Sequence, residues 1–217
     1  MNIKSKALPT QQRALRKRDA LIDAASSEFA RRGFDVATAK SIAASAGVAT
    51  GTFYQYFNDK SDILREVARQ RFDHLQDQVG SLEFTKSVNQ LSDQHDPAGI
   101  VELFEQTLSF VYDFHAREPE LHQILEYRRN LDTQLHAIMN QGERAMQARV
   151  LEFVHTFNLA NAEAVADNLF AMGEGVIHRH VFFQSDLNID EVIHSAAEML
   201  ASFFVTQNRK SVNDTTI

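Results

Sequence analysis

Hydrogen-bonding and aromatic side chains crowd into the segment between Ala49 and Phe57. Hydroxyl and amide groups bind phosphate oxygens and the base edges in the major groove of DNA, and methyl groups contact thymine. If Phe53 and Phe57 face a core, the polar residues lie on the remaining surface of a short helix. The residues considered for these contacts are Thr50, Gly51, Thr52, Tyr54, Gln55 and Tyr56. The alternative is a small core helix with incidental polar residues.

The elements that would position this segment are two short helices joined by a tight turn. Residues 38–46 form the first helix, which the Thr38 hydroxyl can cap, and residues 49–56 form the second. Gly47 supplies the left-handed backbone conformation that the turn needs. Thr38 has no Glu or Gln three residues later, so only half a capping box is expected. Because Ala49 has no capping side chain, Thr50 or no residue caps the second helix.

The spacing of small, apolar and aromatic residues from Ala24 to Leu64 resembles the DNA-binding domain of TetR/AcrR-type transcriptional repressors. The resemblance rests on Ala24, Phe29, Gly33, Thr38, Ile42, Ala43, Ala46, Gly47, Val48, Gly51, Thr52, Phe53, Tyr54, Tyr56, Phe57, Lys60 and Leu64. In that family the first short helix lies across the DNA backbone and the second enters the major groove. The resemblance therefore implies a DNA-binding set of Thr38, Lys40, Thr50, Gly51, Thr52, Tyr54, Gln55, Tyr56 and Lys60, with Thr38 and Lys60 on phosphates. Ala49 departs from the serine that is frequent there.

Composition sets limits on the class of protein. The chain has 217 residues, enough for one large or two modest domains. The absence of cysteine excludes disulfides, a thiolate nucleophile and a cysteine-ligated zinc ion. No apolar run approaches the roughly 18 to 20 residues of a membrane span, and the basic N-terminus lacks the apolar stretch of a secretory signal. We therefore expect a cytoplasmic protein.

The net charge of −7 is unevenly distributed. Residues 1–60 hold ten Lys or Arg against five Asp or Glu, which leaves 12 basic against 24 acidic residues in the rest of the chain. This distribution is typical of a small basic DNA reader joined to an acidic body, because the attraction to phosphate is then local. Arg13, Arg16, Lys17 and Arg18 can reach phosphates beside the site, or serve only solubility.

Helical periodicity continues to the end of the chain without an alternating strand pattern, so the predicted fold class is all-α with about nine helices. The predicted helices span about 12–32, 38–46, 49–56, 59–80, a helix from 97, a short helix from 119, and 130–157, 160–183 and 189–205. The predicted domains are a helix-turn-helix domain (1–58), a connecting helix (59–80), a helical ligand-binding and dimerisation domain (81–207) and a mobile tail (208–217). Residues 1–11 are expected to form a mobile arm, and residues 80–96 a fraying helix end and a loop.

The last two predicted helices, 160–183 and 189–205, carry more apolar residues than one core needs. Small residues such as Gly173 and Ala196 allow close helix approach. The resemblance implies an isologous four-helix interface between two chains, and a dimer suits pseudo-palindromic DNA sites. The alternative is that both helices pack only within their own chain.

An apolar and aromatic pocket in the larger domain would suit a hydrophobic small-molecule effector. The predicted ligand-binding set is Phe104, Leu108, Tyr112, Leu125, Arg128, Met146, Val150, Phe170 and Glu174. Arg128 or its neighbour Arg129 favours a carboxylate or acyl ligand, whereas Glu174 favours a cation. Each is also plausible as an ordinary surface or core residue. Further polar candidates are His115, His122, Tyr127, His155 and His178.

Catalytic and metal motifs are absent from the sequence. His178 and His180 diverge by about 200° on a helix and cannot share an ion, and there is no HExxH, calcium loop, nucleophile elbow or phosphate-binding loop. We therefore expect no enzyme, no cofactor and no metal, but a homodimeric, ligand-responsive repressor. Two alternatives stay open: an activator or architectural DNA binder without a ligand, and a small-molecule carrier or enzyme that does not read DNA sequence.

Overall fold

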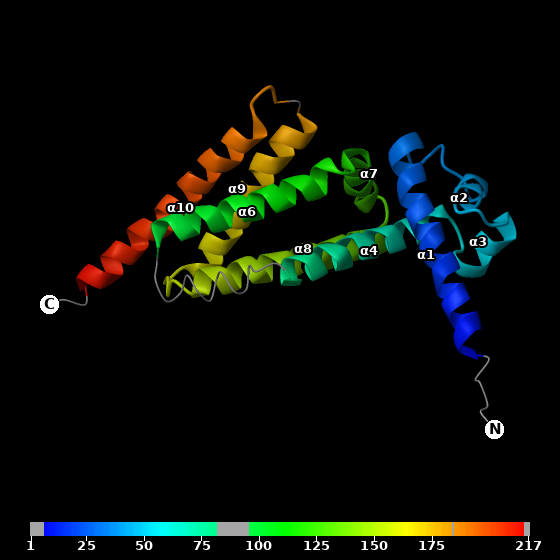
Figure 1. Cartoon of the computed structure of the whole chain (residues 1–217), viewed down its shortest axis with the longest axis horizontal. Coiled ribbons are helices and arrows are strands. Elements are labelled where there is room, and N and C mark those ends of the chain that lie inside the picture. Colours follow the sequence, from blue (N-terminus) through cyan, green and yellow to red (C-terminus); the bar gives the residue numbers. More distant parts are fainter. Residues whose placement is uncertain (1–6, 82–95, 184, 215–217) are drawn as a thin grey trace. The chain divides into compact units, whose positions relative to one another are not determined.

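The computed structural model describes residues 7–81, 96–183 and 185–214, and the regular structure in these ranges is entirely helical, as predicted (Figure 1). The helices are α1 (Ala7–Arg32), α2 (Ala39–Ser45), α3 (Thr50–Tyr56), α4 (Lys60–Ser81), α6 (Pro97–Ala116), α7 (Pro119–Arg129), α8 (Thr133–His155), α9 (Ala162–Phe182) and α10 (Ile189–Asp214). None of these described helices has the length and apolar character needed to cross a membrane.

Most helix limits lie close to those predicted, because strong stop and start signals mark them. Gly33, with φ +79°, follows α1, and Asp96 accepts a hydrogen bond from the Ala98 amide in front of Pro97 at the start of α6. The two chain ends differ from prediction. Helix α1 begins within the expected mobile arm, and α10 continues into the expected tail. The segment predicted at 80–96 lies largely outside the described residues.

Packing divides the chain into two units, and the first is discontinuous in sequence. It comprises the described residues 7–73 together with 120–141. Helices α1, α2 and α3 lie beside one another (Figure 1). Their core includes Phe29, Ile42 and Phe53, which are all fully buried. The same core contains four residues from α7 and α8, namely Leu121, Leu125, Leu135 and Met139. The helix-turn-helix therefore shares its core with residues far along the chain.

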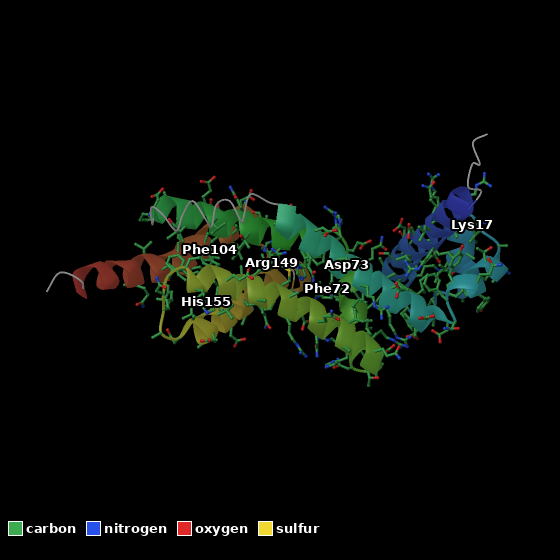
Figure 2. All side chains as sticks on the ribbon, turned by 90° about the horizontal axis from the view of Figure 1, so that it is seen from below. Lys17, Phe72, Asp73, Phe104, Arg149 and His155 are labelled. Carbon is green, nitrogen blue, oxygen red and sulfur yellow. The ribbon has the colours of Figure 1, made fainter. Side chains whose placement is uncertain are left out.

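The second unit comprises the described residues 74–81, 96–119, 142–183 and 185–214. Helix α6 packs against α9 and α10. An aromatic cluster fills its core: Phe104, labelled in Figure 2, lies 5.6 Å from Phe153 and 5.8 Å from Phe204, measured between ring centroids. Phe157 lies 4.6 Å from Phe204. The domain boundaries predicted from the sequence, at residues 58, 80 and 207, stay a prediction.

Candidate nucleic-acid interface

Helix α2 begins at a complete capping box. The Thr38 hydroxyl accepts from the Ser41 amide at 3.0 Å, and the Ser41 hydroxyl accepts from the Thr38 amide at 3.0 Å. The prediction of half a box was wrong because serine, and not only Glu or Gln, can return this bond. Gly47 follows α2 with φ +68°, and the Val48 amide donates to the Ala43 carbonyl at 2.9 Å. These bonds fix the angle at which the chain enters α3.

Helix α3 has one buried and one exposed face. Phe53 and Phe57 are buried, and their ring centroids lie 5.7 Å apart. On the opposite face Gly51, Tyr54 and Gln55 are exposed, as the helical spacing requires. Thr50, Thr52 and Tyr56 are half-buried on the flanks. The polar residues predicted to touch DNA thus share a helix whose apolar side holds it to the core.

The N-terminus of α3 is left without a side-chain cap. Ala49 occupies the cap position and makes no side-chain hydrogen bond. Thr50 therefore does not act as the cap, which resolves the two options that the sequence left open. A Cβ built at Gly51 would meet no described atom within 4 Å. The protein itself therefore does not require glycine at this position.

Lys60 is engaged within the protein. Its ammonium donates to the carbonyl oxygens of Phe34 at 2.8 Å, Asp35 at 3.1 Å and Ala37 at 3.4 Å. It also lies 4.5 Å from the centroid of the Phe34 ring. These contacts join the start of α4 to the loop between α1 and α2. A phosphate contact by Lys60 stays a prediction and would have to compete with these bonds.

Arg128, predicted as a ligand contact, lies against the same loop. Its guanidinium carbon is 4.0 Å from the centroid of the Phe34 ring, and Nη1 is 3.7 Å from the Asp35 carboxylate. Phe34 is buried, and its ring makes cation–π contacts with both Arg128 of α7 and Lys60 of α4. In this arrangement Arg128 helps to hold the helix-turn-helix unit together.

The basic residues of α1 and α2 fall into two groups. Arg18 pairs with Glu66, and Arg31 and Arg32 pair with Glu28. The second group is exposed and makes no ion pair with a described side chain: Arg13, Arg16, Lys17 and Lys40. Figure 2 labels Lys17 on α1. The second group carries the positive charge that is open to a polyanion.

Glu28 is a buried carboxylate between α1 and α2. Its hydrogen bond from Arg31 lowers the pKa of the Glu28 carboxyl below its usual range, although burial opposes this. Ser41 and the charges of Arg31 and Arg32 act in the same direction as the Arg31 bond. Glu28 therefore remains ionised at neutral pH and helps to fix α2 against α1.

The predicted ligand-binding residues do not all lie in one unit. Leu125 and Arg128 belong to the first unit, and Leu125 is part of its core. The other seven belong to the second unit, where Phe104 and Leu108 are buried core residues and Tyr112, Met146, Val150, Phe170 and Glu174 are half-buried. The Tyr112 ring lies 5.6 Å from the ring of His180. A ligand role for these residues stays a prediction.

Glu174 lies between two histidines of the second unit. Its Oε2 is 2.9 Å from Nε2 of His178, one turn along α9, and 4.0 Å from Nε2 of His115 on α6. Burial tends to raise the pKa of Glu174, but the adjacent His178 and the charges of both histidines outweigh it and lower that pKa. The sequence could show only the Glu174–His178 spacing, because His115 is far away along the chain.

Comparison with known proteins agrees with the helix-turn-helix geometry. Residues 21–67 match the pattern of the family described as bacterial regulatory proteins, tetR family. A stretch of 59 residues is 39% identical to the HTH-type transcriptional repressor KstR2 of Mycolicibacterium smegmatis. That stretch is 27% of this chain and 29% of KstR2, so the alignment spans less than a third of the relative.

The likeness in fold to solved regulators extends to the second unit. A putative TetR-family regulator from Mesorhizobium loti has a TM-score of 0.73 at 20% identity, over 89% of this chain and 97% of that one. The regulator FadR from Bacillus subtilis, solved in complex with stearoyl-CoA, has a TM-score of 0.63 at 17% identity, over 84% and 97% of the two chains. At these identities the likeness concerns the fold.

Proposed function

We propose that this protein is a transcriptional repressor that binds a pseudo-palindromic operator as a homodimer. A hydrophobic small molecule that binds the second unit would release the repressor from the operator. The observation that carries the proposal is the exposed face of α3, where Gly51, Tyr54 and Gln55 stand opposite the buried Phe53 and Phe57. A recognition helix needs such a division, because one side must hold the helix while the other meets base edges.

The phosphate contacts come from groups around that helix. The Thr38 hydroxyl accepts from Ser41 and keeps its own hydrogen to donate to a phosphate. Lys40, exposed on α2, adds a positive charge, and so do the exposed Arg13, Arg16 and Lys17 of α1. These contacts supply affinity without sequence information, whereas the α3 face supplies sequence discrimination.

Helices α9 and α10 support the homodimer. On α9 the exposed residues Ala164, Ala171 and Gly175 lie on one face, with Met172 beside them. On α10 Met199 and Phe203 are exposed at 62% and 38%. A flat small-residue stripe next to large apolar side chains allows close helix packing across a two-fold axis. Two such helices from each chain would form a four-helix interface.

The effector is proposed to be an apolar molecule, for which the aromatic second unit offers the chemistry. FadR of Bacillus subtilis has this fold and was solved with stearoyl-CoA. Long-chain acyl-CoA is therefore the first probe. A ligand can release DNA only if it binds the DNA-free conformation more tightly than the DNA-bound one, so the test is release of bound operator and not binding alone.

The first experiment selects random duplex DNA against the purified protein at two salt concentrations. A recovered pseudo-palindrome supports the proposal, whereas only motif-free, salt-sensitive binding contradicts sequence-specific repression. Tyr54→Ala is expected to flatten the preference among selected sites, because an α3 contact to base edges is lost. Tyr127→Ala, which removes a tyrosine of similar exposure (66% against 60%), is the matched control and should retain the motif.

A further inference from the structure

We propose that His115, Glu174 and His178 form a binding site for a divalent transition-metal ion, with Zn²⁺ as the representative ion. The site lies within the second unit and joins α6 to α9. It goes beyond the proposed repressor function and does not depend on it.

The spacing of the three side chains fits one ion. The Glu174 Oε2 is 2.9 Å from His178 Nε2 and 4.0 Å from His115 Nε2. Ligand nitrogens of His115 and His178 lie within 4.8 Å of each other. Ligands bound tetrahedrally to zinc at about 2.1 Å are about 3.4 Å apart. Small side-chain rotations therefore bring all three groups to bonding distance.

The hydrogen bond to the backbone fixes which ring nitrogen of His115 can bind a metal ion. Its Nδ1 lies 2.8 Å from the Val111 carbonyl oxygen, which can only accept, so Nδ1 carries the hydrogen. In the neutral ring the lone pair is then on Nε2, which faces Glu174. A backbone carbonyl that holds the outer ring nitrogen in this way is typical of metal-ligating histidines. His115 is 5% exposed, so its orientation is fixed by packing.

An aromatic ring beside the cluster makes its surroundings partly apolar, which favours an ion bound by all three side chains over separated charges on them. The Phe182 ring lies 5.2 Å from His178 and 6.4 Å from His115, so one side of the cluster is apolar. Two imidazoles and one carboxylate suit zinc and its neighbours in the first transition series, whereas magnesium and calcium prefer oxygen ligands alone.

The test measures Zn²⁺ binding to the full-length, untagged, chelator-treated protein by calorimetry. Visible absorption of the Co²⁺ form provides a second readout that reports nitrogen and oxygen ligation. We expect about one tight equivalent per chain, which raises the unfolding temperature because the ion binds only the folded state. His178→Ala and the nearly isosteric Glu174→Gln should each weaken Zn²⁺ binding roughly tenfold or more and change the Co²⁺ spectrum.

The matched control is His194→Ala. His194 also pairs with a glutamate, Glu105, in the second unit, but it is exposed. This variant should bind Zn²⁺ like the wild type. Absence of a stoichiometric Zn²⁺ equivalent overturns the proposal and leaves an ordinary His–Glu ion pair. Binding that is lost in His194→Ala but kept in both His178→Ala and Glu174→Gln overturns it equally.

Discussion

Gly51 and Lys60 were both predicted to touch DNA, but a substitution affects the folded domain differently at the two positions. Gly51 lies on the exposed face of α3 with open space where a Cβ would stand. Lys60 is tied to three carbonyl oxygens of the loop between α1 and α2. A change at Gly51 therefore reports on the DNA complex, whereas a change at Lys60 reports first on the folded domain.

Gly51→Ala is expected to separate DNA binding from stability. Alanine is favoured over glycine in a helix by up to about 1 kcal/mol, so the unfolding free energy should stay the same or rise. Operator affinity should fall by roughly tenfold or more if DNA approaches α3 closely at this point. Urea unfolding and fluorescence anisotropy measure the two effects. Undiminished operator affinity would show that DNA does not approach here.

Lys60→Ala is expected to lower the unfolding free energy by roughly 1–3 kcal/mol, because three carbonyl oxygens lose a charged donor. DNA affinity should be measured well below the unfolding transition, where a phosphate contact would appear as an equal loss across sequences. Lys40→Ala is the control, since Lys40 is exposed and should affect DNA binding alone. Equal stability of the two variants would contradict the structural role of Lys60.

The sequence predicted the α3 residues but not the partners of the charged ones. Residue types and helical spacing placed Phe53 inside and Tyr54 outside. The acceptors of Lys60 are backbone carbonyl groups. Every residue has such a group, so residue types could not indicate these partners. Likewise, His115 and Glu174 meet only because α6 packs on α9, so neither a motif nor a spacing could reveal the cluster.

At the scale of elements, Asp132 joins α8 to α4. Its Oδ1 accepts from the amides of Gln134 and Leu135 at 2.9 and 3.0 Å, and its Oδ2 accepts from Arg65 at 3.0 Å. Burial tends to raise the pKa of Asp132, but the Leu135 amide, Arg65 and the Gln134 amide outweigh it and lower that pKa. One carboxylate therefore caps a helix and holds a second helix against it.

Asp132→Ala should cost roughly 1–2 kcal/mol of unfolding free energy at neutral pH, because the cap and the ion pair are lost together. Asp132→Asn keeps a capping oxygen and should cost less. Because the folded-state pKa of Asp132 is depressed, its charge stabilises the fold above the unfolded pKa of about 3.9, and this contribution is lost as the pH falls further. The wild-type advantage over Asp132→Asn should therefore shrink in acid, as measured by urea unfolding at neutral and low pH. A pH-independent advantage would exclude a role for the charge.

Helix positions were largely predictable, whereas helix lengths at the chain ends were not. Apolar residues at helical spacing, Gly33 after α1 and Pro97 at the start of α6 are strong local signals. Helix α10 continues beyond Val205 to Asp214 through a mostly polar stretch whose only apolar residue is Val212, so periodicity gives no signal there. The division into units was equally hidden, because it depends on which distant helices share a core.

At the scale of the whole molecule, the proposed dimer depends on apolar groups that one chain leaves exposed. The double variant Met172→Asp with Met199→Asp places charges on both α9 and α10, and we expect it to be monomeric in light scattering with unchanged helix content. Leu131→Asp is the control, since Leu131 is 63% exposed and lies outside both helices. A double variant that remains dimeric would move the interface elsewhere.

The shared core of the first unit has a consequence for building hybrid regulators from this protein. Leu121, Leu125, Leu135 and Met139 complete the core that surrounds Phe29 and Phe53. A chimera spliced only within α4 would combine a reader from one parent with α7 and the start of α8 from another, and mismatched side chains leave cavities or overlaps. A working graft should therefore transfer residues 120–141 together with 1–73, as two pieces from the same parent.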